Sequence, residues 1–430
     1  MTTAAAARRG MSRTQVIAAT TIGNALEFFD FTVYSFLAVV IGRLFFPTMS
    51  PYGQLLLSVA TFGVGFFMRP LGGIVIGAYA DRRGRKAAMT LTINLMALGC
   101  ALIALAPTYA QAGLVAPLVI VLARLIQGFS AGGEVGASTT LLIEYATPQN
   151  RGYYASWQFA SQGLGVTIGA TLAGILSATL SPEQMDSWGW RVPFAVGVLI
   201  LPVGIYIRRQ LEETLEPRDQ GKVEHGPVMT TLREHGRLVL LGILLTIGGT
   251  VSAYITTFYM PTYGIRELGL PMPLALLAGI LSGFITFVAS PFVGLAADRV
   301  GRKKLILGAR LVTLVLVYPC FLWLNAAPSA ERLLIVVGVL SVLLAIQTAP
   351  AITMMPELFP KAVRATGMSI VYSIGVALFG GFAQFIATWL INATGDKLSP
   401  AYYLIACLVV STLALIGLED RTGREIDGRK

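Results

Sequence analysis

Charged side chains stand deep inside several apolar stretches of the sequence, where a charge is costly. The five deepest are Glu27, Asp30, Arg69, Arg124 and Glu134, and Arg310 stands nearer the end of another such stretch. Each stretch is long enough for a helix to cross a lipid bilayer, which takes about 20 residues. A charge at membrane depth costs several kcal/mol, so it is usually paired or functional. These residues are therefore predicted to bind a ligand, to take up protons or to pair with one another.

The stretch that contains Arg124 places several polar groups on one face of its predicted helix. At about 100 degrees per residue, Gln127 and Glu134 share a stripe with Arg124, and Gly128 and Gly132 lie beside it. A guanidinium group donates two parallel hydrogen bonds and suits a carboxylate ligand. Arg124 and Gln127 are therefore predicted to bind a ligand, and Glu134 to carry a proton. Alternatively, Arg124 and Glu134 pair with each other and only hold helices together.

The first apolar stretch also gathers its polar residues on one face. Asn24, Glu27, Asp30 and Tyr34 share about one third of the helix circumference, so they face a cavity or partner helices. Asn24 and Tyr34 are predicted to bind a ligand, and Glu27 and Asp30 to carry protons. Equally, one of the two acids could neutralise Arg69, which would then be a helix-pairing charge.

Amide and hydroxyl side chains recur on one face of two further apolar stretches. Gln158 and Gln162 share a face in one of them, and Thr250, Tyr254 and Thr257 lie together in the other. Such groups can hold the carboxylate or hydroxyl groups of a ligand. They can equally well hydrogen-bond neighbouring helices to one another, so both roles stay open for each residue.

The composition indicates a chain whose solvent is mostly lipid. Of its 430 residues, 55% are hydrophobic and 13% are charged, whereas soluble domains carry about 25% charged residues. Backbone groups cannot stay unpaired in hydrocarbon, so long apolar segments must be helices. Twelve such segments are predicted, over 15–41, 54–80, 87–108, 113–143, 154–180, 189–208, 238–262, 273–297, 303–325, 332–355, 366–392 and 400–418. The predicted fold class is an all-α membrane protein with twelve transmembrane helices.

The longest polar stretch divides these segments into two sets of six. The predicted units are a six-helix bundle over 1–207, a linker over 208–237 and a second six-helix bundle over 238–430. Both histidines, His225 and His235, lie in the linker. Since no histidine stands at membrane depth, a coupled proton would be carried by buried carboxylates or by the ligand itself.

A charged loop occurs at the same place in each half. Residues 77–86 read Gly-Ala-Tyr-Ala-Asp-Arg-Arg-Gly-Arg-Lys and residues 294–303 read Gly-Leu-Ala-Ala-Asp-Arg-Val-Gly-Arg-Lys. Gly84 and Gly301 permit a tight turn in these loops, and a second pair of motifs follows further along each half. The halves are therefore expected to repeat one six-helix unit. The residues predicted to form a gate between them are Asp81, Arg82, Arg85, Asp298, Arg299, Arg302, Glu144, Arg151, Glu357 and Arg364. In the alternative, the loops are only topology signals.

The net charge of +10 is explained by the placement of the basic residues. If both termini are cytoplasmic, 24 of the 32 basic residues fall on the cytoplasmic side of the predicted spans, as the positive-inside rule requires. The basic excess therefore orients the chain in the membrane, and nucleic acid is not an expected partner.

Several of these motifs resemble known families. The loop over 77–86 looks like the signature loop of the major facilitator superfamily, and residues 124–128 resemble its fourth-helix motif. Residues 23–34, 65–73 and 188–194 are similar to the metabolite:proton symporter family. Members of that family carry citrate, 2-oxoglutarate, shikimate, or zwitterions such as proline and betaine. Within the family, residues 124–133, 156–162 and 261–264 resemble the citrate and tricarballylate carriers.

The resemblance implies the major facilitator fold and a secondary active transporter that works by alternating access. The expected substrate is citrate or a related di- or tricarboxylate, taken up with protons, and sodium stays open as the coupling ion. A zwitterionic osmolyte or another organic acid, such as 2-oxoglutarate or shikimate, is the alternative. No cofactor or metal is implied, and a monomer in the bacterial inner membrane, with both termini cytoplasmic, is expected. The sequence holds no nucleotide-binding loop and no His-Glu-x-x-His motif, so an enzyme or ATP-driven pump is not expected.

Overall fold

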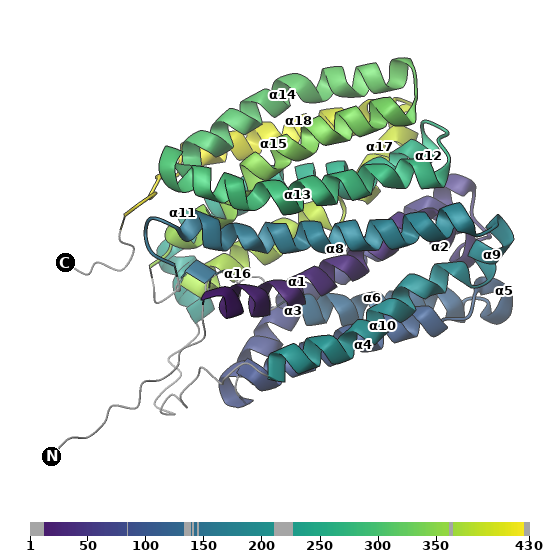
Figure 1. Cartoon of the computed structure of the whole chain (residues 1–430), viewed down its shortest axis with the longest axis horizontal. Helices are drawn as coiled ribbons and strands as arrows, with labels where there is room; N and C mark the ends of the chain where they lie inside the picture. Colours follow the sequence, from purple (N-terminus) through teal and green to yellow (C-terminus); the bar gives the residue numbers. More distant parts are fainter. Residues whose placement is uncertain are drawn as a thin grey trace.

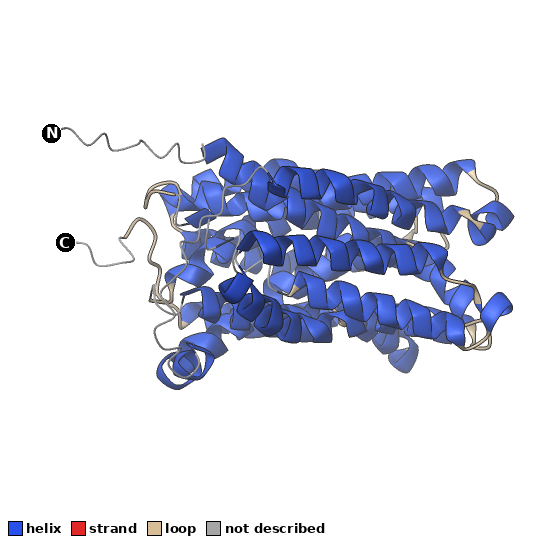
Figure 2. Ribbon diagram, turned by 90° about the horizontal axis from the view of Figure 1, so that it is seen from below, coloured by secondary structure: helices blue, strands red, loops and turns tan. Residues whose placement is uncertain are grey.

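The computed structural model describes residues 13–83, 85–132, 139, 142–143, 146–209, 227–360 and 364–424. Within these ranges all regular structure is helical, and the long helices run side by side along one axis (Figures 1 and 2). The predicted linker lies largely outside the described residues. The division at residues 207 and 237 therefore stays a prediction.

The first half of the chain contributes ten helical elements. They are α1 (Arg13–Phe36), α2 (Ala38–Phe45), α3 (Pro51–Arg83), α4 (Arg85–Leu105), α5 (Tyr109–Ala112), α6 (Val115–Ala131), α8 (Arg151–Thr179), α9 (Pro182–Ser187), the 3₁₀ turn η1 (Gly189–Arg191) and α10 (Val192–Arg209). This tally covers only the residues described above. Part of the predicted span over 113–143, including Glu134, lies outside them.

The second half contributes ten more elements among the described residues. They are α11 (Pro227–Ala253), the π-helical segment η2 (Tyr254–Tyr259), α12 (Met260–Arg266), α13 (Met272–Val300), α14 (Arg302–Ala326), α15 (Ala330–Glu357), α16 (Arg364–Gly375), the π-helical segment η3 (Val376–Gly380), α17 (Ala383–Thr394) and α18 (Ser399–Ile416).

Each predicted membrane span coincides with a helix of the described chain. Eight helical segments are long and apolar enough to cross a membrane, and the bent pair α1 and α2 supplies a ninth. Three shorter apolar helices, over Thr90–Leu105, Val115–Ala131 and Gly189–Leu199, fall in the three remaining predicted spans. The prediction of an all-α membrane protein with twelve spans is confirmed.

Three spans depart from straight α-helices. The first bends by 60° between Thr21–Phe36 and Ala38–Phe45, where the Phe36 ring packs against Gly279 of α13. The other two contain η2 and η3, which meet where Gly380 of η3 packs against the Tyr254 ring. A wider π-helical turn is often found at a functional site. Apolar composition alone could not predict these departures, because they depend on what the helix packs against.

Helices of the two halves touch along α8 and α13, which lie side by side (Figure 1). The two backbones meet at two places, Gly152 with Gly294 near one end and Gly163 with Gly283 near the middle. A β-carbon at any of these glycines would collide with backbone of the opposite helix. Glycine at these positions therefore sets how closely the two halves approach.

Candidate functional site

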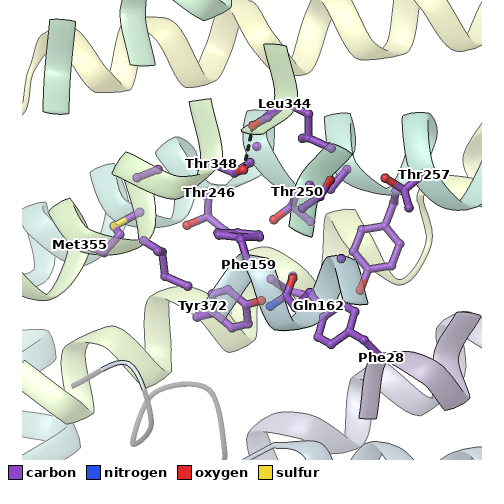
Figure 3. Close-up of a pocket in the computed structure, with 18 of the residues that line it drawn as sticks. Phe28, Phe159, Gln162, Thr246, Thr250, Thr257, Leu344, Thr348, Met355 and Tyr372 are labelled. Atoms are coloured by element: carbon purple, nitrogen blue, oxygen red, sulfur yellow. Dashed lines mark hydrogen bonds between the residues drawn. The ribbon is translucent and has the colours of Figure 1, made fainter. Parts of the chain in front are cut away.

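A cavity lies among helices of both halves. The volume open to the centres of water molecules is about 80 Å³. The cavity therefore has room for several waters. The lining is mostly apolar and aromatic. The polar residues among the described lining are Gln162, Thr246, Thr250, Tyr254, Thr257, Thr286, Arg310, Thr348 and Tyr372, several of which Figure 3 shows around the same space. Of the described lining residues, Arg310 alone is charged.

Four of the predicted ligand-binding residues line this cavity: Gln162, Thr250, Tyr254 and Thr257. Tyr254 and Thr257 belong to η2, so the wider π-helical turn places both side chains at the cavity. The Thr257 hydroxyl lies 2.8 Å from the Ser282 hydroxyl of α13. The structure brings these residues from α8, α11 and η2 together, and their contact with a ligand stays a prediction.

The other predicted ligand-binding residues are not part of the cavity lining. The Asn24 side chain donates hydrogen bonds to the Gln158 carbonyl oxygen at 2.8 Å and to the Ser161 hydroxyl at 2.7 Å. These bonds join α1 to α8. The Tyr34 hydroxyl donates to the Ser58 carbonyl oxygen of α3 at 3.4 Å. In this conformation the side chains of Asn24 and Tyr34, and the backbone of Gln158, make contacts between helices, which is the alternative to ligand binding that the sequence leaves open.

Arg124 is completely buried and paired within the first half. Its guanidinium lies 3.4 Å from the Asp30 carboxylate and donates to the Gln127 side-chain oxygen at 2.7 Å. It also stands over the ring of Tyr34, at 4.7 Å from the centroid. Asp30 receives a second contact from the Cys100 sulfur at 3.0 Å. Asp30 is thus a carboxylate partner of Arg124, whereas Glu134, the partner that the sequence offers as an alternative, lies outside the described residues.

A second buried pair joins α3 to α1. The Arg69 guanidinium donates to the Glu27 carboxylate at 3.1 Å, and both side chains are almost fully buried. The guanidinium also stands over the Phe66 ring at 4.2 Å. Arg69 is therefore neutralised by Glu27, which is one of the two possibilities that the sequence analysis gave for this residue.

Aromatic rings separate the two buried pairs from the cavity. Phe62 stands beside the Arg124 guanidinium at 5.1 Å, and Phe66 beside that of Arg69. Both rings also contact the Tyr254 ring, at 6.3 and 5.7 Å between centroids, and Tyr254 lines the cavity. The guanidinium groups thus reach the cavity only through these phenylalanine rings and Tyr254 among the contacts described. The role of Arg124 as a ligand-binding residue stays a prediction for other conformations.

The predicted gate residue Asp298 joins the two halves at one end of the bundle, here called the charged end. Its carboxylate accepts hydrogen bonds from the backbone N–H groups of Gly152 at 2.8 Å and Tyr153 at 3.0 Å. These residues lie in the first turn of α8, and a helix N-terminus favours a negative charge. Gly301, which follows α13, has a φ of 104°, so this turn has the glycine that the sequence predicts for it.

Three more predicted gate residues complete a network at the charged end. Arg302 pairs with Asp298 at 3.2 Å and with Glu357 at 3.1 Å, and Arg151 lies 3.8 Å from Glu357. The network thus spans α8, α13, α14 and α15. Arg299 is exposed and Arg364 is buried at the start of α16. The side chains of the remaining predicted gate residues, Asp81, Arg82, Arg85 and Glu144, lie outside the described part of the chain.

The segment after α18 also belongs to the charged end, which the sequence analysis did not predict. The Asp420 carboxylate accepts the backbone N–H of Lys303 at 3.2 Å, and the Arg424 carbonyl accepts a bond from Arg151 at 2.9 Å. Partial burial by itself raises the pKa of Asp420, but hydrogen bonds from Thr422 and from Lys303 outweigh it, and the pKa lies below its ordinary value. The carboxylate is therefore ionised at neutral pH and can cap α14.

Asp298→Ala is expected to open the charged end. The substitution removes the acceptor of two charge-assisted hydrogen bonds between the halves, each worth about 1.5–3 kcal/mol. We expect a maleimide reagent to label a cysteine introduced at the buried Ser156 at least about 10-fold faster in this variant, in a background without the three native cysteines. Glu331→Ala, a change at an exposed acidic residue in the first turn of α15, is the control. Equal labelling in both variants would show that Asp298 does not hold the halves together.

Family models and known transporters match this chain over most of its length. The Major Facilitator Superfamily model matches residues 20–290, and the model described as Sugar (and other) transporter matches residues 208–427. The citrate-proton symporter of Salmonella typhi is 39% identical over 408 residues, covering 94% of this chain and 93% of that protein. The citrate-proton symporter of Klebsiella pneumoniae is 38% identical, covering 97% and 94%.

A solved structure shares the fold. The crystal structure of a D-xylose-proton symporter superposes with a TM-score of 0.77, covering 94% of this chain and 96% of that one. Because the two sequences are only 18% identical, this likeness shows the fold alone. The near full-length matches to the symporters above show more. The chain belongs to the major facilitator superfamily and, within it, to the metabolite:proton symporter family that its motifs resemble.

Proposed function

We propose that this membrane protein takes up citrate, or a related di- or tricarboxylate, together with protons. The observation that supports the substrate class best is the likeness to two citrate-proton symporters over more than nine tenths of the chain. The cavity agrees with an anionic substrate. Among its described lining residues there is one cation and no carboxylate, so a polyanion would meet no like charge there.

The contacts between the halves support alternating access. At the charged end, Asp298 holds the first turn of α8. At the opposite end, the Ser35 hydroxyl of α1 lies 3.1 Å from the Gln384 side-chain oxygen of α17 and donates to the Phe258 carbonyl oxygen at 3.3 Å. The cavity lies between these two sets of contacts. Opening one set while the other stays closed would expose it to one side of the membrane at a time.

The buried pairs support a proton as the coupling ion. A proton on Asp30 would remove the counterion of Arg124, and buried cations without a counterion are unstable. Protonation would therefore favour a rearrangement of α1, α3 and α6 around Arg124. A proton on Glu27 would act in the same way on Arg69. Glu134 is a further candidate for the residue that carries the proton. Sodium remains the alternative coupling ion, to be separated by experiment.

The distribution of basic residues supports an orientation. We propose that the charged end faces the cytoplasm of a bacterial cell, with both termini on that side, in accordance with the positive-inside rule. One chain contains both six-helix halves and a cavity between them. It is therefore proposed to function as a monomer in the inner membrane, without a cofactor.

A binding screen and a flux assay test this function. Purified protein is heated with citrate, tricarballylate, 2-oxoglutarate, shikimate, proline or betaine, because a bound ligand stabilises the native state. We expect citrate or tricarballylate to raise the melting temperature most. In proteoliposomes, an inward proton gradient should drive uptake of labelled citrate, and a protonophore should stop it. Stabilisation by betaine alone would contradict the carboxylate, and uptake driven only by a sodium gradient would contradict the proton.

A further inference from the structure

Arg310 is a buried cation at the edge of the cavity. It lies on α14, is 0% exposed and belongs to the cavity lining. Its two terminal nitrogens donate to backbone carbonyl oxygens, one to Ser411 of α18 at 2.9 Å and the other to Leu245 of α11 at 2.9 Å. Its Nε is buried and has no hydrogen-bond partner among the described residues. Three of the five N–H donors of the guanidinium are thus left for another group.

The charge of Arg310 differs from that of three other buried arginines in lacking an acidic partner among the described residues. Arg69, Arg124 and Arg302 each pair with a carboxylate. Among the described residues no carboxylate pairs with Arg310, and its two partners are neutral carbonyl groups. A buried charge without a counterion costs several kcal/mol. Arg310 would therefore gain from an anion that enters the cavity.

A second donor, from the first half, lines the same cavity. The side-chain amide of Gln162, on α8, is buried beside the Tyr372 hydroxyl, as Figure 3 shows, and its nitrogen carries two N–H donors, so at least one is left beside that contact. By contrast, the hydroxyls of Thr246 and Thr348 donate to backbone carbonyls of their own helices. Arg310 in the second half and Gln162 in the first therefore both offer N–H donors to an acidic ligand.

We propose that Arg310 binds a carboxylate of the transported anion, and that Gln162 holds a second oxygen of the same molecule. The ligand class is an organic anion with at least two oxygen-bearing groups. Bound in this way, the anion supplies the counterion that Arg310 lacks and connects the two halves through itself. The assignment rests on the proposed function, since it names the residue that recognises the proposed substrate.

A purely structural role is the competing explanation, because Arg310 also joins α11, α14 and α18 through its two carbonyl contacts. Arg310→Gln and Arg310→Lys separate the two roles. Glutamine can still donate to a carbonyl but has no charge, whereas lysine keeps the charge but loses the planar fork. Arg332→Gln is the control. Arg332 lies near the start of α15, far along the bundle from Arg310, and donates to the Trp323 carbonyl oxygen near the end of α14.

The decisive measurement is the citrate dissociation constant of each purified, monodisperse variant by calorimetry. We expect Arg310→Gln to bind citrate about 10- to 100-fold more weakly, as for the loss of a charged hydrogen bond, and Arg310→Lys to lie in between. The control should bind like the wild type. A structural role would instead lower the melting temperature of Arg310→Gln and leave its dissociation constant unchanged, which would overturn the proposal. Wild-type protein that binds no carboxylate would contradict the proposed function itself.

A chemical test needs no substitution and therefore holds if the variants do not fold. Phenylglyoxal modifies arginine, and peptide mass spectrometry of wild-type protein reports the rate at each site. We expect citrate to slow the modification of Arg310 at least about 10-fold, at concentrations well above its dissociation constant, while Arg332 reacts at the same rate. Equal rates at Arg310 with and without citrate, or no reaction there at all, would contradict binding of the substrate at this residue.

Discussion

Gly128→Ala is expected to prevent the first half from folding. A β-carbon at this position of α6 would overlap the carbonyl oxygen of Gly65 on α3, so the two helix backbones would have to separate. Neighbouring contacts, Gly132 against the Arg69 carbonyl and Gly72 against that of Phe129, would be lost with it. Overpacking of a close contact costs about 3 kcal/mol when neither side can move. The measurement is the yield of monodisperse protein and its melting temperature in detergent.

Gly308→Ala is the matched control for this prediction. Gly308 lies on α14, and an added β-carbon there would meet nothing within 4 Å. Alanine is the better helix former by about 1 kcal/mol, so this variant is expected to be at least as stable as the wild type. If the two alanine variants had the same melting temperature, the close contact of α3 and α6 would not be a determinant of the fold.

Asp30→Asn is expected to abolish proton-driven uptake of citrate while exchange of internal for external citrate continues. Asparagine has nearly the shape of a protonated aspartate but cannot release or take up a proton. It also leaves the buried Arg124 with the neutral Gln127 as its hydrogen-bond partner. Flux into proteoliposomes with and without a proton gradient, and counterflow without one, measure the two activities separately.

The same assays apply to a control variant, and their results can contradict the role predicted for Asp30. Asp186→Asn changes an aspartate outside the predicted spans that pairs with Arg43, and it should leave both activities unchanged. If Asp30→Asn still accumulated citrate against a gradient, the proton would be carried elsewhere, and Glu27 and Glu134 would be next to test. Loss of both activities together would point to a general role of the Arg124 pair in folding.

The architecture could be predicted because lipid leaves a chain few choices. Backbone groups in hydrocarbon must be paired within a helix, so each long apolar stretch coincides with helix in the described chain. Helical periodicity also placed Asn24, Glu27 and Asp30 on a face that is buried in the structure. Periodicity fixes which residues share a face. It does not say which helix that face meets.

What the sequence could not give were contacts between helices. Arg124 is predicted to meet a ligand, yet its partners in the structure include Asp30 and Gln127, because the arrangement of the helices brings Asp30 of α1 within reach of α6. Arg310 stood near the end of a predicted span, where a long side chain can reach the interface. Its carbonyl partners on α11 and α18 instead hold it at the cavity. The only signal in the sequence was a lone arginine within an apolar stretch.

The glycine contact between α8 and α13 has a consequence for how the carrier moves. Gly163 and Gly283 both line the cavity and touch through their backbones, so neither residue has a side chain that must be unpacked when one helix turns on the other. If the two helices rotate about this contact, the residues around it move least and the ends of the helices move most. The anion would then contact the same part of the cavity lining from whichever side of the membrane it entered. The net direction of transport would come from the ion gradient and not from a difference in affinity between the two conformations.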